Sequence, residues 1–576
     1  MYIQFIPAVG VVSMIVPVFA RRRLTGYTFI TLSILATGFI SFGLWVHHMF
    51  TVGLPALSLA LFTAASMTIA IPSGIQVFAW LATIWGGRIV WKTPFLFVVG
   101  FLVTFVAGGL TGVMLAAVPF NWQVHDSYFV VAHFHYVMIG GVVFPIFAGI
   151  YYWTPKFTGK LLHEGLGRWN FWLVFLGFHI AFFPMHIAGL LGMPRRVYTY
   201  PEGLGWQPYN LVSTIGAFIL AGGILVFLWN VLWTYRRGEQ AGPNPWGADT
   251  LEWATSSPPP QYGFRTLPIV HSRHPLWDQE GLDKGDERVV KLVRALAQWP
   301  RDYRSQLITT TIDARPQEIF QIAGPSIWPL MLSIGITVIS IAFIFDFLII
   351  AGLGVLLSVA SLIAWHWPDE KTAATGEEAA FEAEHGVPVN VAGSREVARW
   401  GMYLTIITLA IVIGTMIFSY FFLRLDSAQW PPIGISLPPL LWPSIGTGLL
   451  VASALPLIWA TRGIRRGTQR PLKVGLAASL VLGSVALVAQ VTGYLDPGFS
   501  WRTHAYGSLF WTTAAFQSLF MIGGLIMNIM TQYWAWAGNY DRRHYQTVEN
   551  TALYWYFTVV SGLVVFATLY LAPYII

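Results

Sequence analysis

Histidine is the residue type most able to do chemistry in this sequence, and its most distinctive pair is His133 and His135, separated by one phenylalanine. On a helix, residues two positions apart point about 200° apart, so these imidazoles cannot share one ion. Each could instead be the axial ligand of a separate haem, a common role of imidazole. Alternatively, each could bond to a neighbouring helix, and the spacing alone leaves both interpretations open.

Two further groups have metal-binding chemistry. His47 and His48 are adjacent near the end of an apolar stretch. Adjacent side chains diverge on a regular helix, but where a helix ends the backbone can turn both rings to one ion. Imidazole without thiolate favours copper, zinc or iron. His125 and Asp126 could hold a divalent cation, but an acidic residue before a helix is also an ordinary cap, which is the simpler interpretation of this pair alone.

The composition places these residues in a membrane. The chain has 576 residues, of which 55% are hydrophobic and 10% charged, whereas soluble domains carry about 25% charged residues. A soluble enzyme is therefore excluded. Cysteine is absent, which excludes disulfides and thiolate metal sites. The net charge of +7 is explained by charge asymmetry between membrane loops rather than by a nucleic-acid surface.

Long apolar stretches must position the histidines. About 20 apolar residues cross a bilayer, and stretches of this length predict an all-α polytopic membrane protein with about 14 transmembrane helices. Seven are expected first, at 2–19, 28–49, 57–84, 94–117, 127–153, 169–192 and 209–235. A hairpin is expected at 327–344 and 347–366, and five more helices at 399–424, 440–460, 473–494, 505–533 and 551–574.

Polar stretches divide these helices into groups. The stretch after the seventh helix is rich in charge and proline, and an acidic stretch follows the hairpin. Such composition is typical of loops and linkers. We therefore expect a seven-helix segment 1–255, an extramembrane linker 256–325, a hairpin 326–368, an acidic connector 369–398 and a five-helix module 399–576.

Loop charge predicts the orientation. Every second loop is basic, which assigns those loops to the cytoplasmic side of a bacterial membrane. Arg195 and Arg196 break the alternation. They are either ordinary surface arginines or the partners of an anion at the membrane edge, because guanidinium suits carboxylates. The alternation also places the adjacent histidines, the His–Asp pair and these arginines toward one face. Haem propionates would satisfy such arginines, so we expect two metallocofactors there, one beside a second metal.

Five short runs occur in the order and spacing of a known family. They are Trp45–Gly53 (WVHHMFTVG), Ala70–Gly74 (AIPSG), Gly108–Gly112 (GGLTG), His125–Tyr136 (HDSYFVVAHFHY) and Gly192–Arg196 (GMPRR). Residues 2–255 thus resemble subunit I of the haem-copper terminal oxidases. The resemblance implies that His47 and His48 are two ligands of the active-site copper.

The same resemblance assigns the other histidines. His133 would bind the iron of the high-spin haem beside the copper, and His135 the iron of the low-spin haem. It also implies that the His125–Asp126 pair binds magnesium and that Arg195 and Arg196 meet haem propionates.

The start of the chain departs from the family. Subunit I normally has further helices there, which bring the second low-spin haem ligand and a proton pathway. Tyr2 aligns with the tyrosine of the motif H-P-(E/D)-V-Y and would supply an electron and a proton. The third copper ligand would lie upstream, so we expect a truncated gene model. An in-frame His-Pro codon pair before Met1 would support it, and a stop codon there would contradict it.

The proton pathway departs as well. The family commonly has a lysine where this chain has Gln76, near Ser73. Glutamine cannot carry a proton by titration. Protons then travel through other groups and water, or this branch of the pathway is altered.

Residues 399–576 resemble subunit III of the same enzyme through Trp430–Pro432, His504–Ser508 and Val548–Trp555. The family often has FHGLH at Phe516–Phe520 and a histidine at Tyr556, and this chain has neither. Subunit III has no redox centre, so the resemblance implies support of subunit I and of its proton entry.

The resemblance implies a respiratory oxidase that reduces oxygen to water with two haems, copper and magnesium. Electrons would come from cytochrome c through a copper-bearing subunit II, with coupled proton movement across the bacterial inner membrane. A quinol donor is one alternative. A nitric oxide reductase, with iron in place of copper, is another, disfavoured by Tyr2, by the His125–Asp126 pair and by the subunit III segment. The remaining alternatives are a chain that is inert as written and a secondary transporter, which the order of the histidines disfavours.

Overall fold

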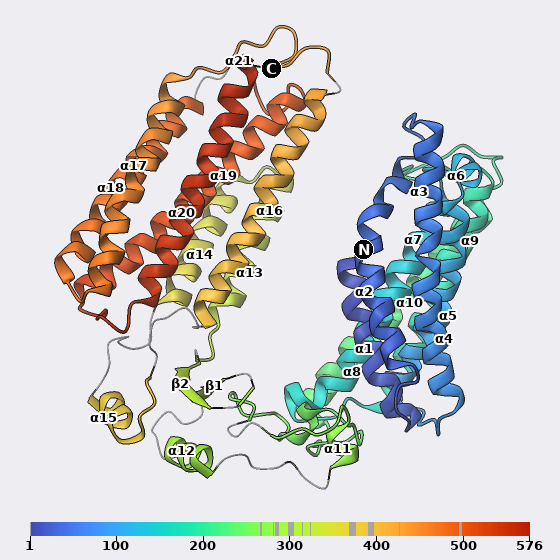
Figure 1. The fold of residues 1–576 in the computed structure, drawn as a ribbon. Coiled ribbons are helices and arrows are strands. Elements are labelled where there is room, and N and C mark those ends of the chain that lie inside the picture. The colour runs from blue at the N-terminus through green and yellow to red at the C-terminus, as the bar shows by residue number, and fades with distance from the viewer. Residues whose placement is uncertain are drawn as a thin grey trace. The chain divides into compact units, whose positions relative to one another are not determined.

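A computed structural model describes the chain except at residues 1, 265–267, 280–281, 283–286, 298–304, 311, 314, 323, 368–375, 390–396, 426, 495–497 and 576, and except for the side chains at 288, 321, 376–377 and 397. The chain divides into two compact units, Met1–Gly285 and Asp286–Ile576 (Figure 1). The expected linker 256–325 is thereby divided between the units.

The first unit is built from helices. They are α1 (Tyr2–Ala20), α2 (Tyr27–Leu44), a 3-10 helix (Trp45–Met49), α3 (Ala56–Thr68), α4 (Ala70–Trp85), α5 (Thr93–Ala116), α6 (Val118–Val124), α7 (Tyr128–His135), a π-helix (Tyr136–Val143), α8 (Phe144–Thr158), α9 (Glu164–Leu190), α10 (Gln207–Arg237), a second 3-10 helix (Leu251–Ala254) and α11 (Pro275–Asp278). Its core is aromatic. Phe97 of α5 stacks on Phe147 and Tyr151 of α8, with ring centroids 5.0 and 5.8 Å apart.

Two of the expected helices are interrupted. The stretch predicted as one helix at 57–84 is divided into α3 and α4 at Ile69. Pro72 explains the break, because proline has no N–H to donate and its ring crowds the carbonyl four residues earlier. The stretch predicted at 127–153 widens into the π-helix directly after His135. Such π-helical turns are frequent at functional sites.

The second unit contains both helices and a small sheet. Its elements are α12 (Glu287–Ala297), β1 (Ser305–Thr309), β2 (Pro316–Gln321), α13 (Trp328–Ile344), α14 (Leu348–His366), α15 (Gly376–His385), α16 (Val397–Leu425), α17 (Leu441–Arg465), α18 (Gln469–Tyr494), α19 (Ala505–Trp536), α20 (Gln546–Phe566), a π-helix (Ala567–Leu571) and α21 (Ala572–Ile575). In Figure 1, α17 and α18 lie side by side.

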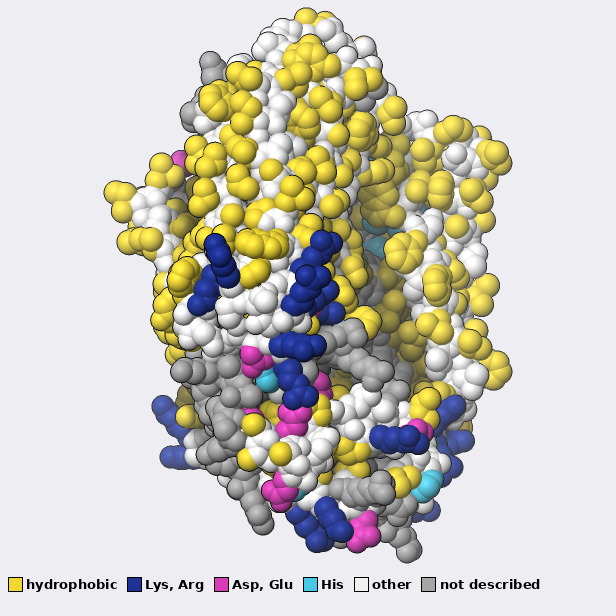
Figure 2. Space-filling model, turned by 60° about the vertical axis from the view of Figure 1, so that its left-hand side comes forward, with side chains coloured by type: hydrophobic (Ala, Val, Ile, Leu, Met, Phe, Trp, Pro, Cys, Tyr) yellow, Lys and Arg dark blue, Asp and Glu magenta, His cyan; other side chains and the backbone are white. Residues whose placement is uncertain are grey.

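The helices confirm the predicted fold class. In the described part of the chain, 13 helices are long and apolar enough to cross a membrane, and Trp328–Ile344 is apolar but shorter. This is an all-α polytopic membrane protein. Figure 2 shows an extensive apolar surface, with Lys and Arg side chains gathered toward one end of it. That separation is expected when a hydrocarbon layer surrounds the helices and charges remain at the interface.

The two polar stretches of the second unit fold together. β1 and β2 pair antiparallel, and the N–H of Ile319 on β2 donates to the carbonyl of Pro388 at 2.8 Å. A small apolar cluster joins them to α12; it comprises Val289, Leu292, Leu296, Leu307, Ile319, Val387 and Val389. We call this group, α12, β1, β2, α15 and 387–389, the polar-segment cluster. The sequence pattern did not predict its strands.

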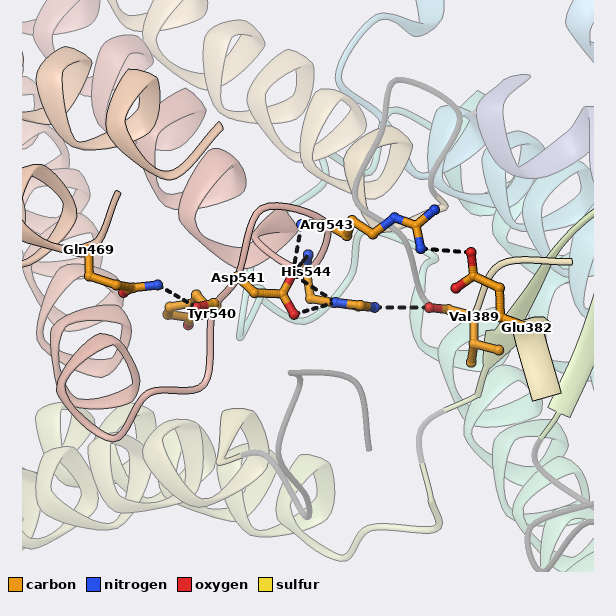
Figure 3. A network of polar contacts seen from close by, with 7 residues as sticks. All are labelled: Glu382, Val389, Gln469, Tyr540, Asp541, Arg543 and His544. Atoms are coloured by element: carbon orange, nitrogen blue, oxygen red, sulfur yellow. Dashed lines mark hydrogen bonds and ion pairs between the residues drawn. The ribbon is translucent and has the colours of Figure 1, made fainter. Parts of the chain in front are cut away.

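The loop between α19 and α20 holds the polar-segment cluster (Figure 3). Arg543 donates to Glu382 of α15 at 2.7 Å. His544 hydrogen-bonds to Asp541 through Nδ1 at 2.9 Å and to the carbonyl of Val389 through Nε2 at 3.1 Å. These contacts attach the cluster to the five-helix module, so the acidic connector packs against the module.

Candidate metal centre

The adjacent histidines lie where a helix ends. α2 gives way to the 3-10 helix Trp45–Met49, and on that turn the ring centroids of His47 and His48 are 4.4 Å apart. Nδ1 of His47 is 3.1 Å from the hydroxyl of Ser66 on α3. A hydrogen bond at one imidazole nitrogen fixes the ring and leaves the other for a metal. The helix end therefore brings the two rings close to each other, and their turning to one ion stays a prediction.

His133 lies against the glycine-rich part of α5. Its Nδ1 is 3.1 Å from the carbonyl of Gly108 and 3.0 Å from the hydroxyl of Thr111. A carbonyl only accepts, so Nδ1 carries the hydrogen and Nε2 is the basic nitrogen. That is the tautomer that binds a metal through Nε2. A Cβ at Gly112 would lie 2.9 Å from Cε1 of His133, so the glycine makes room for the imidazole.

His135 has the same tautomer on a different side of the helix. Its Nδ1 donates to the carbonyl of Val131 at 2.7 Å. Its ring stacks on Phe182 of α9, with centroids 4.1 Å apart and planes 18° apart. His133 thus lies against α5 and His135 against α9. The two imidazoles do not point to one ion, which agrees with the prediction from their spacing.

Electrostatic contacts connect the two histidine groups. His47 and His48 of the helix end both lie within electrostatic range of His133 of α7. Tyr2 begins α1 and is partly buried against the aromatic core, with its ring in edge contact with Phe5. In the described residues, no group of three or more His, Asp or Glu side chains could hold a metal.

Two loops at one end of the unit pair with each other. The guanidinium of Arg195 forms an ion pair with the carboxylate of Asp126, and the backbone N–H of Arg195 donates to the backbone carbonyl of Asp126 at 2.8 Å. Nε2 of His125 lies 3.8 Å from that carboxylate. The cap of α7 is Ser127, whose hydroxyl accepts from the N–H of Phe129. The interpretation of Asp126 as the cap is therefore wrong.

Arg195 and Arg196 differ in their surroundings. Nε of Arg195 is buried and has no hydrogen-bond partner, while Arg196 adopts a left-handed backbone conformation with φ 66°. The buried Nε is a donor available to an anion. This is compatible with the expected propionate contact, although Asp126 already takes part of the Arg195 charge.

Gln76 lies inside the first unit. It is 1% exposed, and its Nε2 donates to the hydroxyl of Thr37 on α2 at 3.2 Å, while its Oε1 has no partner. The hydroxyl of Ser73 donates to its own helix, at the carbonyl of Ile69. A buried carbonyl oxygen without a partner is costly, so this position favours an additional donor such as water.

The sequence interpretation missed two histidines. His179 and His186 both lie on α9 and contact Tyr136 at the start of the π-helix; His186 also contacts Phe129 of α7. Nδ1 of His179 is 2.8 Å from the hydroxyl of Tyr136, and Nε2 of each histidine is buried without a partner. Both are ionisable residues within a membrane span, which is itself a signal of function. They were overlooked because neither is adjacent to another ionisable residue.

Together, the fold and these residues describe a polytopic membrane protein whose first unit carries several histidines within its helices. Residues 1–219 match the family described as Cytochrome C and Quinol oxidase polypeptide I, and residues 318–574 match Cytochrome c oxidase subunit III. The chain therefore combines a domain of the subunit I family with a domain of the subunit III family. The second match includes the α13–α14 hairpin.

Curated relatives match the first half. Cytochrome c oxidase subunit 1 of Bacillus subtilis (strain 168) is 53% identical over 277 residues, 48% of this chain and 44% of the relative. The subunit 1 of Alkalihalophilus pseudofirmus is 48% identical over 277 residues, with the same shares. That of Synechocystis is 48% identical over 269 residues, 47% of this chain and 48% of the relative. The chain thus spans less than half the length of these relatives.

Proposed function

We propose that this chain is part of a respiratory haem-copper oxidase, in which His47 and His48 bind copper, His133 binds the high-spin haem and His135 the low-spin haem. The observation that carries the proposal is the tautomer of the α7 pair. Both histidines donate from Nδ1 to a backbone carbonyl, so both have a basic Nε2. Matching tautomers on two sides of one helix suit two separate axial ligands.

The surroundings of the histidines fit these groups. The donor set is imidazole without thiolate, which suits copper and haem iron. Gly112 leaves space at the edge of the His133 ring that a Cβ would fill. When bound, the haems and copper supply the electron transfer and oxygen binding that reduce oxygen to water. The chain itself holds the ligands, orients their rings and excludes bulk water.

The loops at the same end of the unit suit the charged groups of such a centre. Arg195 and Arg196 would contact haem propionates, with the buried Nε of Arg195 as one donor. His125 and Asp126 would hold magnesium, and the Arg195–Asp126 ion pair would join the two functions. Such an ion pair would keep the charges of the two loops paired beside both sites.

Proton delivery follows from the buried polar side chains of the first unit. Gln76 and Thr37 form a hydrogen-bonded pair between α4 and α2. The free Oε1 of Gln76 would accept from a water, and Ser73 lies one turn earlier on the same helix. Tyr2 would donate a proton and an electron at the metal centre. Neither Gln76 nor Ser73 titrates, so protons would move along water held by them.

The subunit III domain would support the subunit I domain in the bacterial inner membrane. A copper-bearing subunit II would deliver electrons from cytochrome c. The relatives are named cytochrome c oxidase subunit 1, which favours cytochrome c over quinol as the donor.

The proposal is tested by the metal content of the purified full chain, expressed in a haem-producing bacterium. We expect haem, and copper that falls to about a tenth or less in a His47→Ala, His48→Ala double variant, because loss of first ligands abolishes most metal affinity. His366→Ala is the control, since His366 is exposed at the end of α14. Copper retained in the double variant contradicts the assignment.

A further inference from the structure

We propose that Phe182 and His179 of α9 are positioning residues for the α7 histidine pair: Phe182 sets the plane of the His135 imidazole, and His179 anchors the helical turn that follows it. The inference rests on the proposed function, because it concerns the orientation of ligands to haem. It concerns side chains that neither the sequence pattern nor the motifs singled out.

α9 is held firmly against its neighbouring helices. A Cβ at Gly189 would overlap the backbone of Phe129 on α7, so the two helices touch through the glycine. On the other side, a Cβ at Gly216 of α10 would overlap the backbone of Ala181, and Gly177 of α9 is equally close to Leu220. Close backbone contact through glycine leaves little room for α9 to shift.

Phe182 stacks on the imidazole of His135. With ring centroids 4.1 Å apart and planes 18° apart, the phenyl ring covers one face of the imidazole. The Nδ1 bond to the carbonyl of Val131 fixes rotation within the plane, and the stack fixes the tilt of the plane. Stacked aromatic pairs are stabilised beyond the area that they bury, which favours one ring orientation.

A hydrogen bond joins Tyr136 to His179. Tyr136 directly follows His135 and is 2% exposed. It begins the π-helix, whose wider turn is rare and poorly stabilised by backbone bonds alone. The hydroxyl of Tyr136 lies 2.8 Å from Nδ1 of His179. This bond ties the start of the turn to α9 and so fixes the backbone at the histidine pair.

These contacts are placed regularly along α9. His179, Phe182 and His186 follow one helical face. Each contacts α7 or the π-helix: His179 and His186 through Tyr136, and Phe182 through His135. One face of one helix therefore determines the orientation of the ligand helix, as residues behind a metal ligand commonly do.

The experiment compares Phe182→Leu with Phe183→Leu in the haem-loaded full chain. Leucine keeps apolar volume at 182 but removes the stack, while Phe183 is 57% exposed on another face of α9. We expect Phe182→Leu to shift the electron paramagnetic resonance g-values of the haem bound through His135 and to speed haem loss about tenfold. Phe183→Leu should leave both unchanged. Identical g-values in the two variants would overturn the role of Phe182.

A second pair of variants tests His179. His179→Phe keeps an aromatic ring and removes the hydrogen bond, and His179→Gln restores an amide that can bond to Tyr136. We expect faster hydrogen exchange of the amides of 136–143 in His179→Phe, with rescue by His179→Gln. Equal exchange in both variants overturns the anchoring role. A chain without haem contradicts the proposed function and this inference together, whereas a haem spectrum indifferent to the Phe182 and His179 variants contradicts this inference alone.

Discussion

The imidazole of His544 donates to the carbonyl of Val389 while its other nitrogen meets the carboxylate of Asp541 (Figure 3). A carbonyl and a carboxylate only accept, so each ring nitrogen of His544 lies against an acceptor. Val389 belongs to the acidic connector and His544 to the α19–α20 loop. A charged hydrogen-bonded chain therefore attaches the polar-segment cluster to the five-helix module.

This attachment should weaken in acid. Burial alone would raise the pKa of Asp541, but hydrogen bonds from the N–H of Arg543 and from His544 outweigh it, so the pKa is lowered. A carboxyl group with a lowered pKa stabilises the folded state above its unfolded pKa, and this contribution is lost as the pH falls through the folded pKa. We expect protease cleavage within 376–389 to accelerate below pH of about 4.

Asp541→Asn is the control for this acid effect. The amide cannot ionise, so cleavage of the variant should be fast at neutral pH and nearly independent of pH in the acid range. Cleavage of the unaltered chain that does not change on acidification would contradict the attachment.

Glu549 should be important for the stability of the five-helix module. It is buried at the start of α20 and pairs with Arg465 of α17 at 2.7 Å and with Arg399 of α16. Glu549→Gln leaves two guanidinium groups without their carboxylate, so we expect a loss of about 3 kcal/mol in unfolding free energy. Thermal unfolding in detergent measures it.

The matched control is Glu382→Gln, which removes the ion pair between Glu382 and the mostly exposed Arg543. Exposed pairs contribute about 0–1 kcal/mol. Equal losses in the two variants would show that burial does not distinguish them.

Gly112 and Gly109 should differ in their tolerance of alanine. A Cβ at Gly112 would lie 2.9 Å from the His133 ring, whereas a Cβ at Gly109 meets nothing within 4 Å. We expect Gly112→Ala to displace His133 and reduce carbon monoxide binding about tenfold or more. Gly109→Ala should leave it unchanged, because Gly109 faces open space. Parallel carbon monoxide titrations of the two variants measure the difference, and equal affinity would contradict the role of Gly112.

Gln76→Lys should not abolish oxygen consumption in an assembled oxidase. Lysine replaces the Nε2 donor that reaches Thr37, so a donor to the hydroxyl remains. Gln76→Leu, which cannot form this hydrogen bond, should slow turnover. Complete loss of oxygen uptake in Gln76→Lys would show that the position is not permissive.

Local pattern predicted the transmembrane helices and the helix end at His47 and His48, because hydrophobic length is a property of adjacent residues. It also predicted that His133 and His135 would lie on different sides, since that follows from helix geometry. The predicted span at 57–84 is confirmed as Ala56–Trp85; only the irregularity at Ile69 within it was not predicted, although Pro72 was the available signal.

Contacts between distant residues could not be predicted. The pairing of Arg195 with Asp126, the stack of Phe182 on His135 and the small sheet all join segments that are remote in sequence. Their formation depends on how helices and loops pack, which residue type and spacing do not specify. The metal assignments of His47, His48, His133 and His135 stay predictions that chemical measurement must test.

The most direct test of the central claim is the absorbance change when carbon monoxide is added to the reduced, purified full chain. A carbon monoxide-binding haem held by His133 predicts a difference spectrum that is present in the unaltered chain, lost in His133→Ala and kept in His366→Ala. A reduced chain without this spectrum, or one in which His133→Ala retains it, would contradict the account.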